Sequence, residues 1–354
     1  MPNSLSVSAN AMPPSMQAEE GHETNPELYQ HFASLVSSLP TTKGLSNSQF
    51  YRHDHGWHCS LVPIVGAMVA DACFAARPTD IVVATLPKSG TTWIKALLYA
   101  TVHRREHPPA GGGDGGHPLN SVGPHELIRF FEYQLYTRDR VPRLDALPDP
   151  RLFATHLPFA SLPRSAAASG CRIVYVCRDP KDHLVSQWNF ANRFMAMDGL
   201  EPLSAEGAAE LFCAGVSPFG PYWEHVLGYW RAHLAHPERV LFFRYEEMQR
   251  DPAAHVRRLA EFVGRPFGAG AGEEEEDGGG AAVDAIVKLC SFEHMSGLEA
   301  TKAGKTDLTV GTVDNTAFFR RGVVGDWANH LSPETARRID AITEAKFKGS
   351  GLSI

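Results

Sequence analysis

The chain has 354 residues, of which 43% are hydrophobic and 21% charged, a composition typical of a globular protein with a sizeable core. Thirty-three basic and 40 acidic residues give a formal net charge of −7. This balance argues against a global attraction to nucleic acid or to an anionic membrane, so an anionic ligand needs a local cluster of positive groups. The length allows two domains or one large one.

Targeting features indicate a cytoplasmic protein. The first 20 residues lack the basic start and apolar stretch of a secretory signal. The longest apolar run, 61–70, is too short to span a bilayer. The six cysteines form no CxxC pair and no zinc-like spacing, so we expect reduced thiols. We therefore expect no membrane span, no bound metal and no nucleic-acid partner.

Three segments have biased composition. Residues 1–25 are rich in Ser, Asn, Pro and Glu, and we expect a disordered tail there. The glycine-rich stretches 111–116 and 268–280 predict low-complexity surface loops within a domain. The acidic run Glu273–Asp277 is typical of a solvated surface, with a cation site or an acidic docking patch as the alternative.

The rest of the chain alternates strand and helix patterns. Four nearly continuous apolar, β-branched runs predict buried parallel strands, at residues 80–86, 152–155, 172–177 and 239–244. Helix-start signals follow, including Asp-Pro pairs at 179–180 and 251–252 and Ser-Pro at 332–333. The alternation predicts an α/β fold, a three-layer sandwich with a central, mostly parallel sheet. Ligands of such sheets bind beyond the carboxyl ends of the strands.

The segment LPKSGTTW, residues 86–93, lies between the first strand and its helix. A glycine there lets the backbone approach a ligand, and the amides at the start of the helix favour an anion. Lys88 adds a positive charge, and Thr91 and Thr92 add hydroxyl donors. The lysine precedes the only glycine, so the segment is P-loop-like but is not a Walker A loop. The alternative is a plain strand–helix turn with a surface lysine.

Three further segments place polar side chains at the same edge of the sheet. His156 ends the second strand in RLFATHLPF, where it is a candidate catalytic base or only a hydrogen-bonded strand terminus. Arg178 follows the third strand and Ser186 lies two turns into the next helix, which suits recognition of a phosphate. The alternative for Arg178 is a capping pair with Asp179. The segment 318–327, FFRRGVVGDW, offers two more arginines or only a solvated basic turn.

Together, these segments resemble the cytosolic sulfotransferase family, and its plant soluble branch in particular. The matching elements occur in family order over residues 40–348, which the resemblance predicts to be a single sulfotransferase domain. Besides the segments above, they include RYEEM at 244–248 and LCSFEHM at 289–295. The resemblance implies transfer of the sulfuryl group of 3′-phosphoadenosine 5′-phosphosulfate to an acceptor hydroxyl, without a metal.

The resemblance also implies a role for each matching residue. His156 would be the general base, and Lys88 would stabilise the leaving group. The co-substrate would be held by Lys88, Ser89, Gly90, Thr91, Thr92, Trp93, Arg178, Ser186, Tyr245, Cys290, Ser291, Phe292, Arg320, Arg321 and Gly322.

The sequence departs from the family pattern at several positions. Ala154 stands where many animal members have a lysine, so more of the charge stabilisation would fall on Lys88. Arg321 replaces the more usual lysine, which changes reach and geometry. Cys290 replaces a common threonine, and the KxxxTVxxxE dimer motif is absent after Trp327. The oligomeric state is therefore open.

The acceptor is the least defined part of the prediction. We expect its pocket around residues 57–74, 125–136, 190–197 and 295–313, whose aromatic and methionine content suits an apolar small molecule with a hydroxyl group. Phenolics, flavonoids, steroid-like hormones and other hydroxylated metabolites all fit.

The alternatives to a sulfotransferase are a P-loop-type nucleotide-dependent kinase and a catalytically silent protein that binds a nucleotide or metabolite.

Overall fold

The computed structural model describes residues 21–45, 48–53, 56–110, 116–268 and 279–354. At its centre is a five-stranded sheet, in the order β10-β9-β5-β8-β6, in which all neighbours are parallel. The five strands are β5 (Ile81–Thr85), β6 (Arg129–Phe130), β8 (Leu152–Thr155), β9 (Arg172–Cys177) and β10 (Val240–Arg244). The mostly parallel sheet of the sequence prediction is confirmed.

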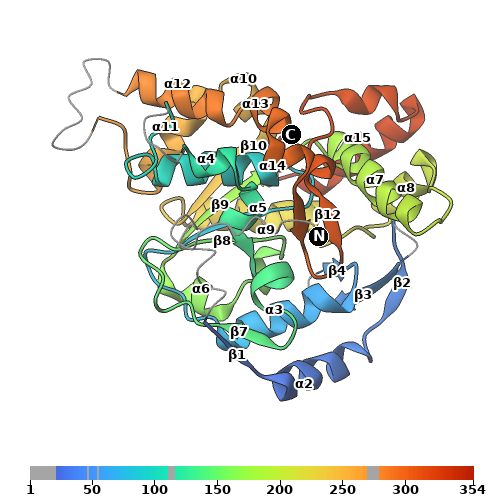
Figure 1. Cartoon of the computed structure of the whole chain (residues 1–354). Helices are drawn as coiled ribbons and strands as arrows, with labels where there is room; N and C mark the ends of the chain where they lie inside the picture. Colours follow the sequence, from blue (N-terminus) through green and yellow to red (C-terminus); the bar gives the residue numbers. More distant parts are fainter. Residues whose placement is uncertain (1–20, 46–47, 54–55, 111–115, 269–278) are drawn as a thin grey trace, which may run out of the picture.

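Helices cover the sheet on both sides. In Figure 1, α4, α11 and α12 lie on one side of the sheet, and α3 and α6 lie on the other. The helices are α2 (Pro26–Val36), α3 (Leu61–Cys73), α4 (Thr91–Val102), α5 (Pro124–Leu127), α6 (Arg164–Ser169), α7 (Pro180–Met197), α8 (Ala205–Cys213), α9 (Tyr222–Ala235), α10 (Tyr245–Arg250), α11 (Pro252–Phe262), α12 (Gly280–Leu289), α13 (Phe292–Gly297), α14 (Glu299–Lys302) and α15 (Pro333–Phe347).

The predicted helix starts agree with the structure because each has a capping side chain. Asp179 accepts hydrogen bonds from the amides of Lys181 and Asp182 at the start of α7, with proline in the first turn. Asp251 caps α11 and Ser332 caps α15 in the same way. These starts fix where α7 leaves the sheet, directly after Arg178.

Short antiparallel sheets lie outside the central one. β1 (His22–Thr24) pairs with β7 (Arg140–Pro142), and β2 (Thr41–Lys43), β3 (Gln49–His53) and β4 (Gly56–His58) form a second sheet. β11 (Lys305–Asp307) pairs with β12 (Thr312–Asp314). The expected disordered tail, 1–25, is therefore wrong over residues 22–24, which the partner strand holds in place. Residues 1–20, 111–115 and 269–278, including the acidic run, lie outside the described residues.

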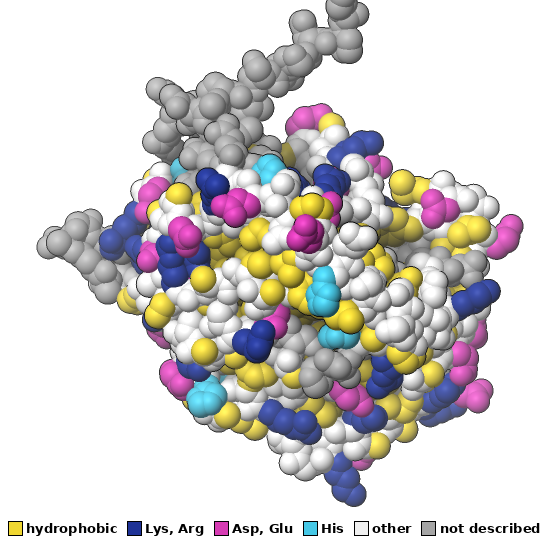
Figure 2. Space-filling view, turned by 90° about the horizontal axis from the view of Figure 1, so that it is seen from below, with side chains coloured by type: hydrophobic (Ala, Val, Ile, Leu, Met, Phe, Trp, Pro, Cys, Tyr) yellow, Lys and Arg dark blue, Asp and Glu magenta, His cyan; other side chains and the backbone are white. Residues whose placement is uncertain are grey.

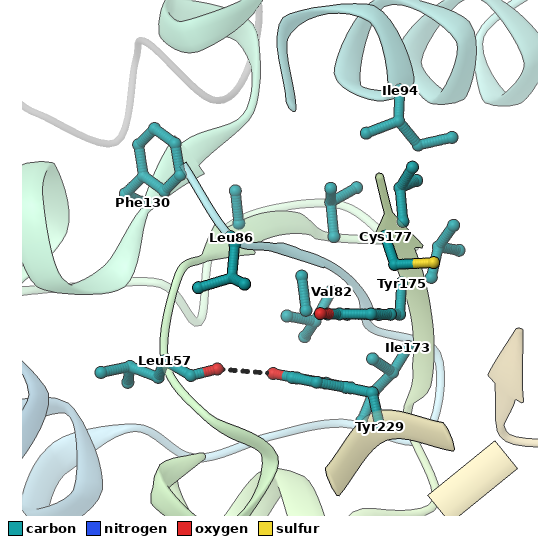
Figure 3. Close-up of a cluster of buried hydrophobic side chains, with 14 of the residues drawn as sticks. Val82, Leu86, Ile94, Phe130, Leu157, Ile173, Tyr175, Cys177 and Tyr229 are labelled. Carbon is teal, nitrogen blue, oxygen red and sulfur yellow. Dashed lines mark hydrogen bonds between the residues drawn. The ribbon is translucent and has the colours of Figure 1, made fainter. Parts of the chain in front are cut away.

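The core lies between the sheet and its helices. β5 is the middle strand, and all five of its residues are buried. Figure 3 shows Val82, Ile173 and Tyr175, from two neighbouring strands, on the side of the sheet that faces Tyr229 of α9, with Ile94 of α4 on the other side. Apolarity on both faces of a strand is what a sheet covered by helices on both sides requires. The packing fixes the strand ends, and with them the side chains that follow.

The surface carries mixed charge on the face shown in Figure 2. There, Lys and Arg side chains are interspersed with Asp and Glu rather than gathered into a broad basic patch. Among the described residues, no helix is long and apolar enough to cross a membrane.

Candidate active site

The order of the strands places four polar or aromatic side chains in a row. Tyr245 follows β10, Arg178 follows β9, Lys88 lies in the loop after β5, and His156 follows β8. Because β10, β9, β5 and β8 are parallel neighbours in this order, their carboxyl ends meet at one edge of the sheet. Segments far apart in the chain are thus brought to one site.

The loop between β5 and α4 approaches the site closely with its backbone. Gly90 has a φ of 96°, and a Cβ atom there would lie 2.8 Å from the Tyr245 ring. Lys88 also has a positive φ, 69°, in the left-handed region that non-glycine residues rarely adopt. The α4 amides at Thr91, Thr92 and Trp93 precede the first intrahelical bond, which Ile94 donates to Gly90. Amides at the start of a helix are an arrangement that favours an anion.

Lys88 is surrounded by other cations. Its Nζ donates to the carbonyl of Ala317 at 3.1 Å and lies 4.3 Å from the centre of the Phe190 ring. Burial lowers the pKa of Lys88 to about 7, helped by the charges of Arg178, Arg193 and Arg320. An anion beside this ammonium would favour its charged form.

Arg178 is buried at the centre of the row. Its guanidinium donates to the carbonyls of Lys88 at 3.2 Å and Val323 at 3.0 Å, and it lies 4.7 Å from the Tyr245 ring centre. Oδ2 of Asp182 lies 3.9 Å from Nη2 of Arg178, so the carboxylate pairs only weakly with the guanidinium charge. Its Nε is buried and has no partner among the described residues. A buried donor without a partner is costly, and an anionic ligand would satisfy it.

The segment 318–327 lies beside Arg178, which donates to the carbonyl of Val323. Asp326 pairs with Arg320 and Arg321, and these partners hold the pKa of its carboxyl below its ordinary value although burial opposes them. The carboxylate of Asp182 accepts hydrogen bonds from the amides of Gly325 at 2.7 Å and Trp327 at 3.0 Å. Asp182 therefore fixes this segment to α7, next to Arg178.

His156 is held on three sides. Its backbone amide donates to Glu132 at 2.6 Å, and its carbonyl lies 3.0 Å from Nε2 of His225. The next carbonyl, that of Leu157, accepts a hydrogen bond from Tyr229 at 2.8 Å (Figure 3). The ring Nδ1 lies 2.7 Å from the carbonyl of Thr85. Since a carbonyl only accepts, Nδ1 carries the hydrogen and Nε2 keeps its lone pair.

The protonation state of His156 suits a base. Burial lowers its pKa to about 3, and the hydrogen bond to Thr85 only partly opposes this effect. The ring is therefore neutral at physiological pH. Phe130, Tyr133 and Phe219 surround it, with ring centroids 4.5, 6.2 and 5.5 Å away. A hydroxyl brought to Nε2 would meet an unprotonated nitrogen in an apolar environment.

One cavity of about 570 Å³ joins these groups. Most of the predicted site residues line it, namely Lys88, Gly90, Thr91, Thr92, Trp93, His156, Arg178, Ser186, Tyr245, Ser291, Phe292, Arg320, Arg321 and Gly322. Each of the four stretches predicted for the acceptor pocket also contributes, through Cys59 and Ser60, through Phe130 and Tyr133, through Phe190 and Phe194, and through Met295, Leu308 and Val310.

Two predicted co-substrate residues do not reach the cavity. The hydroxyl of Ser89 is fully buried and lies 3.1 Å from Nδ1 of His183, and the amide of Ser89 donates to Leu86. Cys290 is fully buried among apolar side chains, and its amide donates to Ile286. The structure gives both a packing position rather than a place in the cavity wall.

Several residues of the site were missed by the sequence reasoning. Glu132, which holds the His156 backbone, and Lys95 are fully buried ionisable residues within apolar runs. That contrast with their neighbours is the signal that could have indicated them. Gln249 bridges Tyr245 at 2.9 Å and the carbonyl of Gly322 at 3.2 Å, and no pattern in the sequence marks it.

The family assignment follows from comparison with known proteins. A family model described as the sulfotransferase domain matches residues 78–351. The chain belongs to the sulfotransferase family. Arabidopsis thaliana cytosolic sulfotransferase 8 is 44% identical over 323 residues, covering 91% of this chain and 92% of the relative. Cytosolic sulfotransferase 15 of the same plant is 41% identical over 322 residues, covering 91% of this chain and 86% of the relative.

Solved structures agree with this assignment. A candidate steroid sulphotransferase of Arabidopsis thaliana has a TM-score of 0.68 and 36% identity, covering 91% of this sulfotransferase and 94% of that chain. Mouse sulfotransferase SULT7A1, complexed with PAP, has a TM-score of 0.62 and 25% identity, covering 85% of this chain and 96% of the mouse chain. The predicted resemblance and fold class are thus confirmed, and the kinase alternative is not supported.

Proposed function

We propose that this sulfotransferase moves the sulfuryl group of 3′-phosphoadenosine 5′-phosphosulfate to a hydroxyl group of a small molecule bound against His156. The observation that carries the proposal is the arrangement of one cavity. It is lined both by Lys88, Arg178 and the start of α4 and by a neutral histidine within aromatic side chains. The anionic nucleotide and a hydroxylated acceptor would meet in this cavity.

The residues present fit the nucleotide. The unpaired Nε of Arg178 and the cavity-lining Ser186 suit a 3′-phosphate, with Arg320, Arg321 and the Gly322 backbone completing the wall. Lys88 and the amides that open α4 suit the 5′-phosphosulfate. Trp93 and Tyr245, whose ring centroids are 5.6 Å apart, are available to an adenine ring, with Ser291 and Phe292 beside them.

The chemistry divides between two side chains. The bound nucleotide supplies an activated sulfuryl group, whose transfer to an incoming oxygen is an in-line displacement by analogy with phosphoryl transfer. His156 accepts the proton of the acceptor hydroxyl at Nε2, while Thr85 keeps the hydrogen on Nδ1. Lys88 stabilises the negative charge that develops on the departing phosphate side. Ala154 is buried in β8 and offers no charge, so Lys88 carries this role without a second lysine on that strand.

Calorimetric titration tests the nucleotide site. We expect 3′-phosphoadenosine 5′-phosphate to bind tightly, 5′-AMP to bind much more weakly, and magnesium to have no effect. Arg178→Met should weaken binding of the bisphosphate by about tenfold or more, because a buried charged hydrogen bond is lost, and should leave 5′-AMP binding nearly unchanged. If the folded protein binds 3′-phosphoadenosine 5′-phosphate no more tightly than 5′-AMP, the proposal is wrong.

We infer that the acceptor is apolar and carries no carboxylate. Among the described lining residues, the cations Lys88, Arg178, Arg320 and Arg321 all belong to the proposed nucleotide site, and Asp198 is the only acid. Aromatic and aliphatic side chains dominate around His156. The related Arabidopsis candidate steroid sulphotransferase supports a hydroxylated polycyclic compound of this kind.

Labelled sulfate provides the test for the acceptor. We expect kcat/KM to fall at least about tenfold when a carboxylate is added to an accepted alcohol, because the acid would be buried without a cation. Equal turnover of both compounds would contradict the inference.

We also propose a cytosolic location, since the named relatives are cytosolic sulfotransferases.

A further inference from the structure

A buried chain of polar groups leads from the interior to the loop at the start of α4. Thr92 and Lys95 are three residues apart in α4 and so lie on the same face of the helix. His125 of α5 lies between them. Its Nε2 is 3.0 Å from the Thr92 hydroxyl, and its Nδ1 is 3.1 Å from Nζ of Lys95. This series of polar groups reaches the cavity at Thr92, which is one of the residues that line it.

Packing alone does not explain a lysine at this position. Lys95 is fully buried, and His125 is 4% exposed. Taking an ammonium out of water is unfavourable unless other groups compensate. Nζ lies 3.2 Å from the centre of the Phe130 ring, whose face attracts a cation. Burial lowers the pKa of Lys95 well below its ordinary value, while Glu132 and Glu126 oppose this and favour the charged form.

The donor and acceptor groups of Lys95, His125 and Thr92 determine which residue donates each hydrogen bond in this series. In its charged form, which Glu132 and Glu126 favour, Lys95 only donates, so Nδ1 of His125 accepts and the ring hydrogen is then on Nε2. Nε2–H donates to the oxygen of Thr92. That oxygen cannot also give its hydrogen back to the same nitrogen, so the hydroxyl hydrogen is left for the cavity, where the amides of α4 already favour an anion.

We propose that Lys95 and His125 are positioning residues that orient the hydroxyl of Thr92 as a donor to the anionic group of the bound nucleotide. This proposal rests on the proposed function of the site. It assigns a role to a fully buried lysine, Lys95, and to His125, which lines the cavity beside Thr92. It also explains why α4 carries a buried lysine one turn behind its start.

A double-mutant cycle tests the proposal, with the affinity for 3′-phosphoadenosine 5′-phosphate as the readout. Thr92→Val should weaken binding by about tenfold or more, since a hydrogen bond to a charged group is lost. His125→Phe should weaken it by about fivefold, because the hydroxyl is no longer oriented. In the double variant, His125→Phe should add nothing to the loss from Thr92→Val, and Thr92→Ser should keep most of the affinity.

Controls separate this role from a merely structural one. Lys95→Met removes the buried ammonium and keeps the length of the side chain, so it provides a second cycle with Thr92→Val if His125→Phe does not fold. Thr101→Val, a buried threonine in the same helix that is not among the described lining residues, should not change the affinity. Independent, additive losses or unchanged affinity in both His125→Phe and Lys95→Met would overturn the proposal. Absence of bisphosphate binding by the unmodified protein would instead overturn the proposed function.

Discussion

His156 shows how a single side chain is prepared for catalysis by its hydrogen bonds. Glu132 and His225 hold its backbone, and the Thr85 carbonyl determines which ring nitrogen keeps the proton. We expect His156→Ala to lower turnover by at least about 10², the usual contribution of a general base. Binding of the bisphosphate, measured by calorimetry, should remain nearly intact.

The matched control for this substitution is an exposed histidine far from the cavity. His31→Ala, in α2, should leave turnover unchanged, because His31 is exposed and is not among the described lining residues. Retention of more than about a tenth of the turnover by His156→Ala would show that another group or water serves as the base.

Lys88 gives the nucleotide affinity a dependence on pH. Its pKa in the free protein is lowered to about 7, so it loses its proton as pH rises above this value. The bisphosphate is fully ionised there, since phosphate monoesters have a second pKa near 6. Binding must then restore the proton, and the affinity should fall by up to about tenfold per pH unit between pH 7.5 and 9.

Titrations of Lys88→Arg over the same pH range provide the comparison. Arginine stays charged in this range, so the affinity of this variant should be nearly flat, whatever its absolute value. A flat profile for the unmodified protein would show that Lys88 does not change protonation when the nucleotide binds.

At the scale of elements, the segment 318–327 depends on backbone conformations that favour glycine. Gly322 and Gly325 have φ values of 65° and 83°. A Cβ at Gly322 would lie 2.5 Å from the Phe292 ring, whereas one at Gly325 would meet nothing within 4 Å. Gly322→Ala should therefore weaken bisphosphate binding several-fold more than Gly325→Ala, because only the former displaces the proposed adenine-side wall. Equal effects of both substitutions would mean that backbone strain alone matters.

The elements themselves were predictable where local signals agree. Capping residues and apolar periodicity predicted α4, α7, α11 and α15, and continuous apolar runs predicted four of the five central strands. β6 was missed because its two residues, Arg129 and Phe130, are too few to form a pattern. β1 was missed because its sequence, His-Glu-Thr, carries no apolar signal, and pairing with β7 alone makes it a strand.

At the scale of the whole molecule, the site depends on the order of strands, which no local pattern contains. The sequence predicts that Lys88, His156 and Arg178 follow strands, and hence that they share an edge of the sheet. It does not predict that β5 lies between β8 and β9, which sets the Lys88 loop between the other two residues. Nor does it predict that Ser89 and Cys290 point into the protein, because burial of a side chain in a turn is decided by tertiary packing.

Buried histidines make the stability of the whole fold sensitive to acid. Burial lowers the pKa of five of them to between about 3 and about 4, namely His58, His117, His156, His183 and His225. Below about pH 6.5 the unfolded chain protonates these rings while the native state does not, so each contributes a loss of up to about 1.4 kcal/mol per pH unit. Glu132, whose pKa burial raises to about 7, acts in the opposite direction and offsets part of the loss.

We therefore expect Tm, measured by calorimetry, to fall by at least about 5 °C between pH 7 and pH 5. His58→Phe should make this fall less steep, because it removes one titrating ring from a site where Nδ1 has no partner among the described residues and the ring packs against Phe219. A Tm that is constant over this range would mean that the buried rings take up protons in the native state. In that case, His156 would be partly charged near neutral pH, and its role as the base would require the acceptor to bind to the deprotonated fraction only.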